Sequence, residues 1–421
     1  MAAMSSTIDA DVAIVGAGPA GATLALALAS GGIKPVLIDR APLSEQWEAT
    51  FDGRAWAIAY SSFRQWKAIG VGGELEPQSQ RIDQIMVTDG RRPGAATPAG
   101  PSPFLLRFDA AEIADRADGE PLGYMLENRV VRLALAKAIK AAGIEVLAPA
   151  QVLGVERESG FATLALDDGR TVKAPLAVAA DGRNSTLRKS AGIGAVGWPY
   201  RQAGAVATVK LERPHQGVAH EYFLPSGPFA ILPLTEDRAS LVWTESPEGA
   251  KALMDASPQA FQAHLERRFG PLMGGATALP GRFSYPLALE LAERLTAPRL
   301  ALIGDAAHGI HPIAGQGLNL GLKDVAALAE VLVDARRLGE DIGSPVVLDR
   351  YAAWRRFDNV SLAIAADAFV RLFSNDNPLL RLARGAGMSV TGMIGPARRF
   401  FMREAGGAVG DLPRLLKGEA L

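Results

Sequence analysis

The sequence of 421 residues contains no cysteine and only five histidines. Without cysteine the chain can form no disulfide, use no thiol nucleophile and build no cysteine-ligated metal site, which fits a reducing compartment. Two histidines, His308 and His311, are close in sequence, but they lie in a turn and no carboxylate completes a convincing ligand triad. We therefore expect no metal site, and we expect both histidines to pack within their loop.

Strong net charge, long apolar runs and aromatic residues are also scarce. The 44 basic and 45 acidic residues leave a net charge of −1, which gives no electrostatic reason to expect a nucleic-acid partner. The first ten residues contain no lysine or arginine, and no apolar run indicates a membrane span, so a signal peptide and a transmembrane helix are both unexpected. These features favour a cytoplasmic protein. With 48% apolar but only 6% aromatic residues, we expect a large aliphatic core.

The chain opens with a β–α–β pattern that surrounds a glycine motif. An apolar strand over residues 11–15 leads into Gly16, Gly18 and Gly21, a helix follows over residues 22–30, and a second strand covers residues 35–38. Such glycines permit a tight turn and a close approach of backbone to a pyrophosphate at the helix N-terminus, and an acidic residue after the second strand accepts ribose hydroxyls. The predicted dinucleotide-binding residues are Gly16, Gly18, Pro19, Ala20, Gly21, Asp39 and Arg40.

A second glycine triad, formed by Gly192, Gly194 and Gly197, has the same spacing but a different context. No strand precedes it and no helix follows it, so we expect a loop that links two lobes. The sequence therefore predicts one dinucleotide fold. A nicotinamide donor would have to bind without a Rossmann domain of its own.

Two further motifs follow apolar strands. Asp181 and Gly182 end a strand over residues 176–180, where Asn184 or Ser185 would cap a helix; structural and nucleotide-facing roles remain equally open there. Gly304 and Asp305 follow a strand over residues 300–303, and a helix is predicted from 318 to 338. We expect Asp305 to accept a hydrogen bond from a ribityl hydroxyl. Backbone N–H groups of residues 315–318 would face the N1/C2=O edge of a flavin, where a helix N-terminus stabilises negative charge.

The order of these patterns predicts an α/β protein: a Rossmann-like FAD-binding domain with an inserted mixed or antiparallel β-sheet domain and C-terminal helices. Short alternating runs at 205–211, 220–224, 229–232 and 240–244 favour the sheet, with a helix near 258–269. Helices are also expected over residues 57–70 and, with an amphipathic pattern, over residues 128–142. We assign residues 1–75, 116–195 and 299–375 to the FAD-binding domain, 76–115 and 196–298 to the substrate domain, and 376–421 to a C-terminal helical tail.

Together these residues resemble the class A flavin-dependent aromatic hydroxylases, and more narrowly their ubiquinone-biosynthesis subgroup. The resemblance spans about residues 10–415 and includes segments outside the glycine motifs. These segments are 51–55 (FDGRA), 127–129 (ENR), 227–233 (GPFAILP), 241–243 (LVW) and 311–319 (HPIAGQGLN).

The resemblance implies FAD as cofactor, with Arg54 in contact with it and Asn128 or Arg129 nearby. It places Pro312 and Gly315 beside the isoalloxazine, and it extends the cofactor-binding set to Asp181, Gly182, Gly304, Asp305, Gln316, Gly317, Leu318 and Asn319. The implied reaction is hydroxylation of a polyprenylated phenol with NAD(P)H and O₂ through a flavin C4a-hydroperoxide, and we assign no catalytic side chain. Candidate substrate walls are Tyr222, Phe229, Leu232 and Trp243, each of which is individually more typical of a protein core than of a pocket.

Several alternatives remain open at this stage. The nearest is a class A hydroxylase of a soluble aromatic compound, and more distant ones are a flavin-dependent prenyl reductase, a halogenase or a non-catalytic FAD-binding assembly subunit. A long prenyl chain requires an apolar tunnel or access to a membrane. Segment 388–402 combines methionine, phenylalanine and arginine, and it is typical of a peripheral contact with the inner face of a membrane, of a solvated helix or of a docking face for other ubiquinone-biosynthesis proteins.

Overall fold

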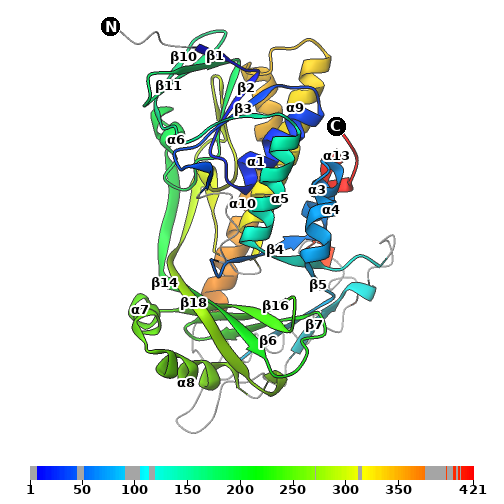
Figure 1. The fold of residues 1–421 in the computed structure, drawn as a ribbon, viewed down its shortest axis with the longest axis vertical. Helices are drawn as coiled ribbons and strands as arrows, with labels where there is room; N and C mark the ends of the chain where they lie inside the picture. The colour runs from blue at the N-terminus through cyan, green and yellow to red at the C-terminus, as the bar shows by residue number, and fades with distance from the viewer. Residues whose placement is uncertain are drawn as a thin grey trace.

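The computed structural model describes residues 7–44, 52–90, 105–112, 119–270, 272–311, 315–374 and 409–421, together with residues 395, 402–403 and 406–407. Figure 1 shows an upper lobe, which contains the ordered start of the chain, and a lower lobe with a large sheet and two short helices. Two long strands and one long helix run between the lobes (Figure 1). The predicted fold class is confirmed: an α/β lobe is combined with a mostly antiparallel sheet.

The upper lobe is built on a six-stranded sheet with the order β19-β20-β13-β2-β3-β9. All neighbouring strands are parallel except the β19–β20 pair. The strands are β2 (Val12–Val15), β3 (Pro35–Ile38), β9 (Glu145–Leu147), β13 (Leu176–Ala179), β19 (Thr296–Ala297) and β20 (Leu300–Leu302). Every residue of β2, β3 and β13 is buried, as expected for parallel strands that are covered on both faces.

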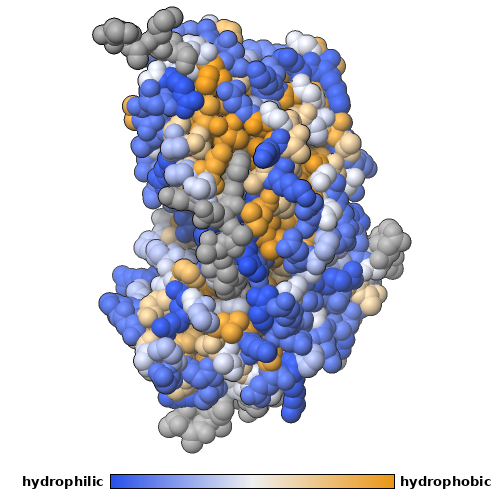
Figure 2. All heavy atoms as spheres, viewed as in Figure 1, coloured by the Kyte–Doolittle hydropathy of each residue, from blue (hydrophilic) through white to orange (hydrophobic). Residues whose placement is uncertain are grey.

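Helices cover one face of this sheet and a smaller sheet covers the other. The helical layer contains α1 (Pro19–Ser30), α5 (Asn128–Ala141) and α9 (Gln316–Arg337), whose apolar residues share one core with Ile14 and Val178. On the opposite face, the four-stranded sheet β1-β12-β11-β10 and helix α6 (Thr186–Ser190) complete a second core. Its strands are β1 (Thr7–Asp9), β10 (Val152–Arg157), β11 (Ala162–Leu166) and β12 (Thr171–Ala174). Figure 2 shows apolar side chains gathered in the upper half of the visible face, whereas hydrophilic residues dominate much of the lower half.

The periodicity of the sequence predicted most of these elements. Helix α5 occupies the predicted amphipathic segment, with Val131, Leu135 and Ile139 buried one turn apart, and α9 begins two residues before its predicted start. The prediction of a helix over residues 57–70 was wrong at its start. Residues 55–59 form β4 (Ala55–Ala59), which pairs with β8 (Gly123–Glu127), and α3 (Tyr60–Ala68) begins only after it.

The lower lobe is formed by an eight-stranded sheet with the order β21-β18-β14-β17-β16-β15-β6-β7. Its neighbouring strands are antiparallel except for the β15–β6 pair. The strands are β6 (Gln84–Asp89), β7 (Leu105–Asp109), β14 (Ala195–Leu211), β15 (Val218–Leu224), β16 (Gly227–Leu234), β17 (Arg238–Glu245), β18 (Ala276–Ala292) and β21 (His308–Gly309). Because β14 to β18 lie in sequence between β13 and β20, this lobe is inserted between two adjacent strands of the upper sheet.

The second glycine triad is not entirely a loop. Strand β14 begins at Ala195, so Gly197 belongs to the ladder and pairs with Glu290 of β18. A side chain at Gly197 would meet the backbone oxygen of Leu289 at 2.0 Å, which explains a glycine in this strand. Within the described residues, β14 is followed by strand β15 and not by a helix.

The two faces of the large sheet contact different parts of the molecule. Phe229 and Trp243 lie on the face that packs against α7 (Pro247–Asp255) and α8 (Pro258–Phe269), in one core with Phe261. On the opposite face, Leu232 and Leu234 of β16 pack in a cluster with Met125 of β8. We call this second face the inner face. Alternate residues of each strand therefore contact either the helices α7 and α8 or the upper lobe.

Helix α10 (Pro345–Phe373) was not predicted from the sequence. It runs from the upper lobe down to the lower lobe (Figure 1), and its buried residues include Tyr351, Arg355, Asn359 and Ala363, spaced four apart. The chain ends with α13 (Arg414–Lys417), while most of the predicted C-terminal tail lies outside the described residues. Among the helices that the structure describes, none is both long enough and apolar enough to cross a lipid bilayer.

We expect the helical layer of the upper lobe to contribute strongly to stability. Replacing Leu328, which is fully buried in α9, with alanine should lower the free energy of unfolding by about 2–5 kcal/mol because a cavity remains. The matched control is Leu338→Ala at the end of the same helix, where the side chain is 73% exposed and the effect should stay within about 0.5 kcal/mol. Urea denaturation followed by circular dichroism measures both values, and equal effects would contradict the assignment of this core.

Candidate functional site

The sequence motifs meet along one edge of the six-stranded sheet. Gly16 follows β2, Asp39 follows β3, Asp181 comes shortly after β13, and Gly304 comes shortly after β20. These four strands are parallel neighbours, so their carboxyl ends lie at the same edge. Ligands of open parallel sheets bind outside this edge. Motifs nearly 300 residues apart in the chain are therefore brought side by side.

The first glycine motif is shaped by backbone contacts that leave no space for side chains. Gly16 has a φ of +109°, and a Cβ atom there would lie 2.2 Å from the oxygen of Ala180. A Cβ atom at Gly21 would lie 2.0 Å from the oxygen of Gly16. By contrast, nothing lies within 4 Å of a Cβ atom at Gly18. The space beside Gly18, at the N-terminus of α1, is thus open, which fits a pyrophosphate.

Asp39 is held at this edge by two backbone groups. Its Oδ2 accepts a hydrogen bond from the amide of Ala17 at 2.7 Å, and its Oδ1 accepts one from the amide of Ala41 at 2.9 Å. A carboxylate oxygen can accept more than one hydrogen bond, so both oxygens can still bind a ribose hydroxyl. The neighbouring Arg40 is exposed.

The Asp181 motif has the structural role that the sequence left open, because its side chains cap a helix. Asp181 Oδ2 accepts a hydrogen bond from the Thr186 amide at 2.7 Å, and Ser185 Oγ accepts one from the Arg188 amide at 3.0 Å, so both side chains cap α6. Asp181 Oδ1 is buried and has no hydrogen-bond partner within the described residues. An orphaned buried acceptor fits a ligand hydroxyl. Gly182 adopts a φ of +83°, which turns the chain directly after Asp181.

The turn at Gly304 and Asp305 lies close to the Asp181 motif. Arg183 Nε lies 3.5 Å from Asp305 Oδ2, and the Asp305 side chain is half exposed, as a group that contacts a ligand should be. Gly304 has a φ of +57°, and a Cβ atom at Gly321 of α9 would lie 3.1 Å from the Cα atom of Gly304. The turn after β20 therefore lies directly against α9.

The N-terminus of α9 points toward the same region. Gly315 is its N-cap in the left-handed conformation, with a φ of +64°, and a Cβ atom there would lie 2.9 Å from the methyl group of Ala57. The first backbone N–H groups of a helix have no partner within the helix and can face a negatively charged ligand edge. The predicted residues Gln316, Gly317 and Leu318 form this first turn, and Gly317 has open space around its Cα. Pro312 lies outside the described residues.

Asn319 is used to join two elements. Its Oδ1 accepts a hydrogen bond from the Ala59 amide at 2.8 Å, while its Nδ2 donates to the Ala57 oxygen at 2.8 Å and to the Gly315 oxygen at 3.2 Å. This amide therefore fixes strand β4 against the N-terminus of α9. We propose that it shapes the cofactor site through the backbone and does not itself contact the cofactor.

The loop that carries Arg54 is fixed in a similar way. Arg54 Nη2 donates to Asp52 Oδ2 at 2.7 Å, and Asn128 Nδ2 donates to the same oxygen at 2.6 Å. Asn128 Oδ1 accepts a hydrogen bond from Trp56 Nε1 at 3.0 Å. Burial alone would raise the pKa of Asp52, but the hydrogen bonds from Asn128 and Arg54 lower it overall. Arg54 remains about half exposed and available to a ligand. Arg129 pairs with Glu127 beside this network.

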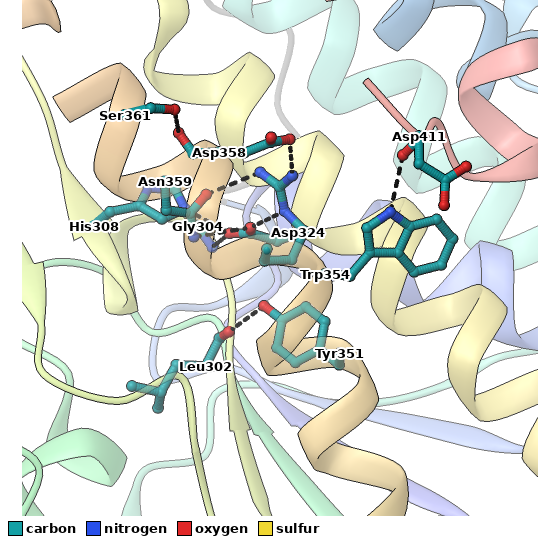
Figure 3. A network of polar contacts seen from close by, with 11 residues as sticks. Leu302, Gly304, His308, Asp324, Tyr351, Trp354, Asp358, Asn359, Ser361 and Asp411 are labelled. Atoms are coloured by element: carbon teal, nitrogen blue, oxygen red, sulfur yellow. Dashed lines mark hydrogen bonds and ion pairs between the residues drawn. The ribbon is translucent and has the colours of Figure 1, made fainter. Parts of the chain in front are cut away.

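A buried charge network, which the sequence analysis missed, supports the Gly304 turn (Figure 3). Asp324 of α9 accepts hydrogen bonds from the Gly304 amide at 3.1 Å, from His308 Nε2 at 2.5 Å and from Arg355 Nε at 2.9 Å. Burial alone would raise the pKa of Asp324, but His308 and Arg355 outweigh it and lower the pKa. Arg355 also donates to Asn359 of α10 at 2.9 Å. The available signal was an aspartate and an arginine on the otherwise apolar faces of two helices.

The two predicted loop histidines contact other elements and not only their own loop. His308 contacts Asp324, and the ring of His311 lies edge-on to Tyr200 with ring centroids 5.2 Å apart. Burial lowers the pKa of His311 to about 4, so this ring is neutral at physiological pH. Within the residues that the structure describes, no group of three or more histidine, aspartate or glutamate side chains could hold a metal ion.

The four predicted substrate-wall residues do not share one face of the large sheet. Tyr222, Phe229 and Trp243 are buried against α7 and α8, in a core that includes Phe261, on the side away from the cofactor motifs. Leu232 lies on the inner face, which packs toward Ala57 of β4. The difference arises because alternation defines two faces without showing which one meets the other lobe. We retain only Leu232 as a proposed substrate contact.

The model of the FAD binding domain family matches residues 9–358 of this chain. The chain belongs to this family. Its cofactor is therefore FAD, and the match includes every glycine motif that converges at the sheet edge. The open helix N-termini and the orphaned Asp181 oxygen are consistent with this cofactor.

Relatives with assigned activities align along almost the whole chain. A ubiquinone hydroxylase, UbiL, from Rhodospirillum rubrum is 46% identical over 416 residues, covering 98% of this chain and 94% of the relative. The 3-demethoxyubiquinol 3-hydroxylase of Escherichia coli is 35% identical and covers 94% and 98%. The human ubiquinone biosynthesis monooxygenase COQ6 is 30% identical and covers 93% and 91%.

Solved structures share the fold. The p-nitrophenol 4-monooxygenase PnpA from Pseudomonas putida superimposes with a TM-score of 0.76 at 21% identity, covering 95% of this chain and 98% of that one. PqsL from Pseudomonas aeruginosa, solved with 2-aminobenzoylacetate, gives a TM-score of 0.74 at 25% identity, covering 91% and 100%. The combination of the α/β lobe and the large sheet is thus that of FAD-dependent monooxygenases.

The close approach of Gly21 to Gly16 leads to a prediction for cofactor binding. In Gly21→Ala, the new methyl group would collide with the Gly16 oxygen, at a cost of about 1–3 kcal/mol. If this strain falls on the bound state, FAD should bind about 10–100 times more weakly. Gly160→Ala is the control, because nothing lies within 4 Å of its Cβ position. Fluorescence titration of apoprotein with FAD measures both; equal affinities would contradict the assigned role.

The Asp324 network leads to a prediction for stability and its pH dependence. Asp324→Asn should lower the free energy of unfolding at pH 7 by about 3–5 kcal/mol, because the buried Arg355 would lose its buried carboxylate partner and keep only the partly exposed Asp358. The lowered pKa of Asp324 in the folded state means that its contribution is present above about pH 4 and is lost as the pH falls further. The difference between wild type and variant should therefore narrow only below about pH 4. Denaturation curves across pH measure this; a constant difference would exclude the assigned ionisation.

Proposed function

We propose that the protein is an FAD-dependent monooxygenase that hydroxylates the aromatic ring of a polyprenylated phenol in ubiquinone biosynthesis. The observation that carries this proposal is the 46% identity to a ubiquinone hydroxylase over 98% of the chain, together with the converged cofactor motifs. Bound FAD supplies electron transfer from NAD(P)H and activation of O₂. The protein must supply binding, orientation and the exclusion of water.

In this proposal, different residues at the sheet edge bind different parts of the cofactor. The N-terminus of α1 at Gly18 binds the pyrophosphate, and Asp39 binds the adenosine ribose. Asp305 binds the ribityl chain, and the first turn of α9 after Gly315 faces the isoalloxazine. Arg54 contacts FAD from the β4 side, where its loop is fixed by Asp52 and Asn128.

The substrate ring lies, in this proposal, between the isoalloxazine and the inner face of the large sheet. Leu232 and the neighbouring cluster residues Ile85 and Phe108 provide apolar surface there. Apolar surface suits a prenylated ring, because burying each CH₂ group of the chain contributes about 0.8 kcal/mol. Membrane contact and docking to other ubiquinone-biosynthesis proteins are proposed for delivery of the substrate.

NAD(P)H is proposed as a transient co-substrate without a Rossmann domain of its own. Among the described residues, only the motif that begins at Gly16 has the Gly-x-Gly-x-x-Gly spacing and joins a parallel strand, β2, to a helix, α1. The Gly197 region belongs to an antiparallel strand instead. The nicotinamide must therefore reach the flavin from the surface and leave after the reduction.

Purified protein loaded with FAD should oxidise NAD(P)H and consume O₂ faster when a prenylated phenol is added. We expect 2-prenylphenols to stimulate both rates more than 4-nitrophenol, because only they bury a chain on the apolar inner face. Complementation of strains that each lack one ring hydroxylase, with mass spectrometry of the accumulated quinone precursor, identifies the ring position. Stimulation by 4-nitrophenol alone would favour a hydroxylase of soluble aromatics, and no stimulation by any phenol would overturn the proposal.

A further inference from the structure

Glu221 is a carboxylate in an unusual place on the inner face. It belongs to β15, where it pairs with Ala230 of β16 on one side and Val87 of β6 on the other. Its neighbours along the same face of β15 are Ala219 and Phe223. All four side chains are apolar, so the strand presents a single acidic group within an apolar surface.

The carboxylate lies between two apolar clusters that belong to different parts of the molecule. Ala219 packs in the cluster with Met125 of β8 and Ala57 of β4, the strand that touches Gly315. Phe223 packs against Phe373 at the end of α10, with ring centroids 4.2 Å apart. Glu221 thus occupies the stretch of β15 between the wall nearest the α9 N-terminus and the wall formed by α10.

Nothing in the described part of the chain pairs with this carboxylate. Glu221 forms no hydrogen bond or ion pair there, although the residue is partly buried. An unpaired carboxylate in apolar surroundings is costly, and such groups concentrate at functional sites. Burial raises the pKa of Glu221 to about 8, which is close to the pH at which an acid–base group works best.

The charged groups near Glu221 either project elsewhere or pair with other residues. On the inner face, Arg238 of β17 pairs with Glu127 at 2.7 Å, and Asp89 lies opposite Phe223 one step along β6. At the end of α10, Arg371 pairs with Asp367 at 2.8 Å. The adjacent His220 points to the other face, edge-on to Tyr222. No described positive charge pairs with Glu221 to stabilise its ionised form.

We propose that Glu221 forms a hydrogen bond with the phenolic hydroxyl of the substrate and accepts its proton during hydroxylation. The inference rests on the proposed function and adds a proton acceptor to it. The phenolic O–H bond breaks, the proton moves to a carboxylate oxygen of Glu221, and the electron pair stays on the phenolic oxygen. A phenolate ring is more electron-rich and is attacked more readily. When the ring regains its aromaticity, the C–H bond at the hydroxylated carbon breaks and its proton is released to solvent, while the proton held by Glu221 returns to the phenolic oxygen.

The proposal is tested with Glu221→Gln, which keeps the shape of the side chain but cannot accept a proton. The probe is 2-(3-methylbut-2-enyl)phenol, and the matched control is Glu248→Gln at an exposed position of α7. In the wild type, kcat/KM for hydroxylation should rise with pH and level off above about pH 8, because the ionised carboxylate is the active form. In Glu221→Gln this rise should disappear, and kcat for hydroxylation should fall about 10²–10⁴-fold.

Other readouts separate proton transfer from a merely structural role. FAD content, thermal stability and the rate of flavin reduction by NAD(P)H should match those of Glu248→Gln, while more of the NAD(P)H oxidised should yield H₂O₂. Glu221→Asp should recover part of the hydroxylation and its pH dependence. A Glu221→Gln variant that keeps the wild-type pH profile would overturn the proposal, whether or not its rate falls.

An infrared measurement distinguishes failure of this inference from failure of the proposed function. Adding the probe to the wild type should perturb a carboxylic-acid C=O stretch that is absent from Glu221→Gln. If this band responds but no phenol is hydroxylated, the proposed function fails while the contact between Glu221 and the phenol stands. If the phenol is hydroxylated and the band does not respond, the function stands and the role of Glu221 is overturned.

Discussion

The cofactor-binding edge depends on backbone segments that approach one another more closely than any side chain would allow. Gly16 lies against Ala180, Gly21 lies against Gly16, and Gly321 lies against Gly304. These contacts join the turns after β2, β13 and β20 to helices α1 and α9. Because they are contacts between main-chain atoms, they hold helices α1 and α9 close to these turns. Binding of the pyrophosphate and of the flavin edge depends on that placement.

The same edge is coupled to the lower lobe through α10. Arg355 on this helix and Asp324 on α9 form a buried pair, and Asp324 also accepts a hydrogen bond from the Gly304 amide. The turn that carries Asp305 is therefore linked to both helices. Phe373, at the far end of α10, packs against Phe223 of the large sheet. Helix α10 thus contacts the support of the cofactor turn through Arg355 and the proposed substrate side through Phe373 at its C-terminal end. A shift of α10 would alter both together.

Local sequence patterns predicted the elements whose conformation depends on residues close in sequence. The glycine spacing, the buried parallel strands and the amphipathic helix α5 were predicted because each has a short-range signature. Strand β4 was not predicted, because its conformation depends on pairing with β8, which is distant in sequence. Helix α10 and the Asp324–Arg355 pair were missed because polar residues at buried positions obscure a helical pattern unless the partner is known. Within the site, alternation along β16 could not show that Leu232, and not Phe229, lies on the inner face.

Which face of the large sheet a residue occupies also decides the chemistry of the inner face. On β15 the consecutive residues His220 and Glu221 project to opposite sides, so a shift of one residue in register would replace the carboxylate on the inner face with the imidazole ring. The register is fixed on both sides, by Ala230 of β16 and by Val87 of β6. Replacing Glu221 with an apolar residue would remove the cost of burying an acid in this cluster. A sheet that had only to hold the lobes together would gain stability from that change, so the acid is best explained by a substrate with a polar group at this point.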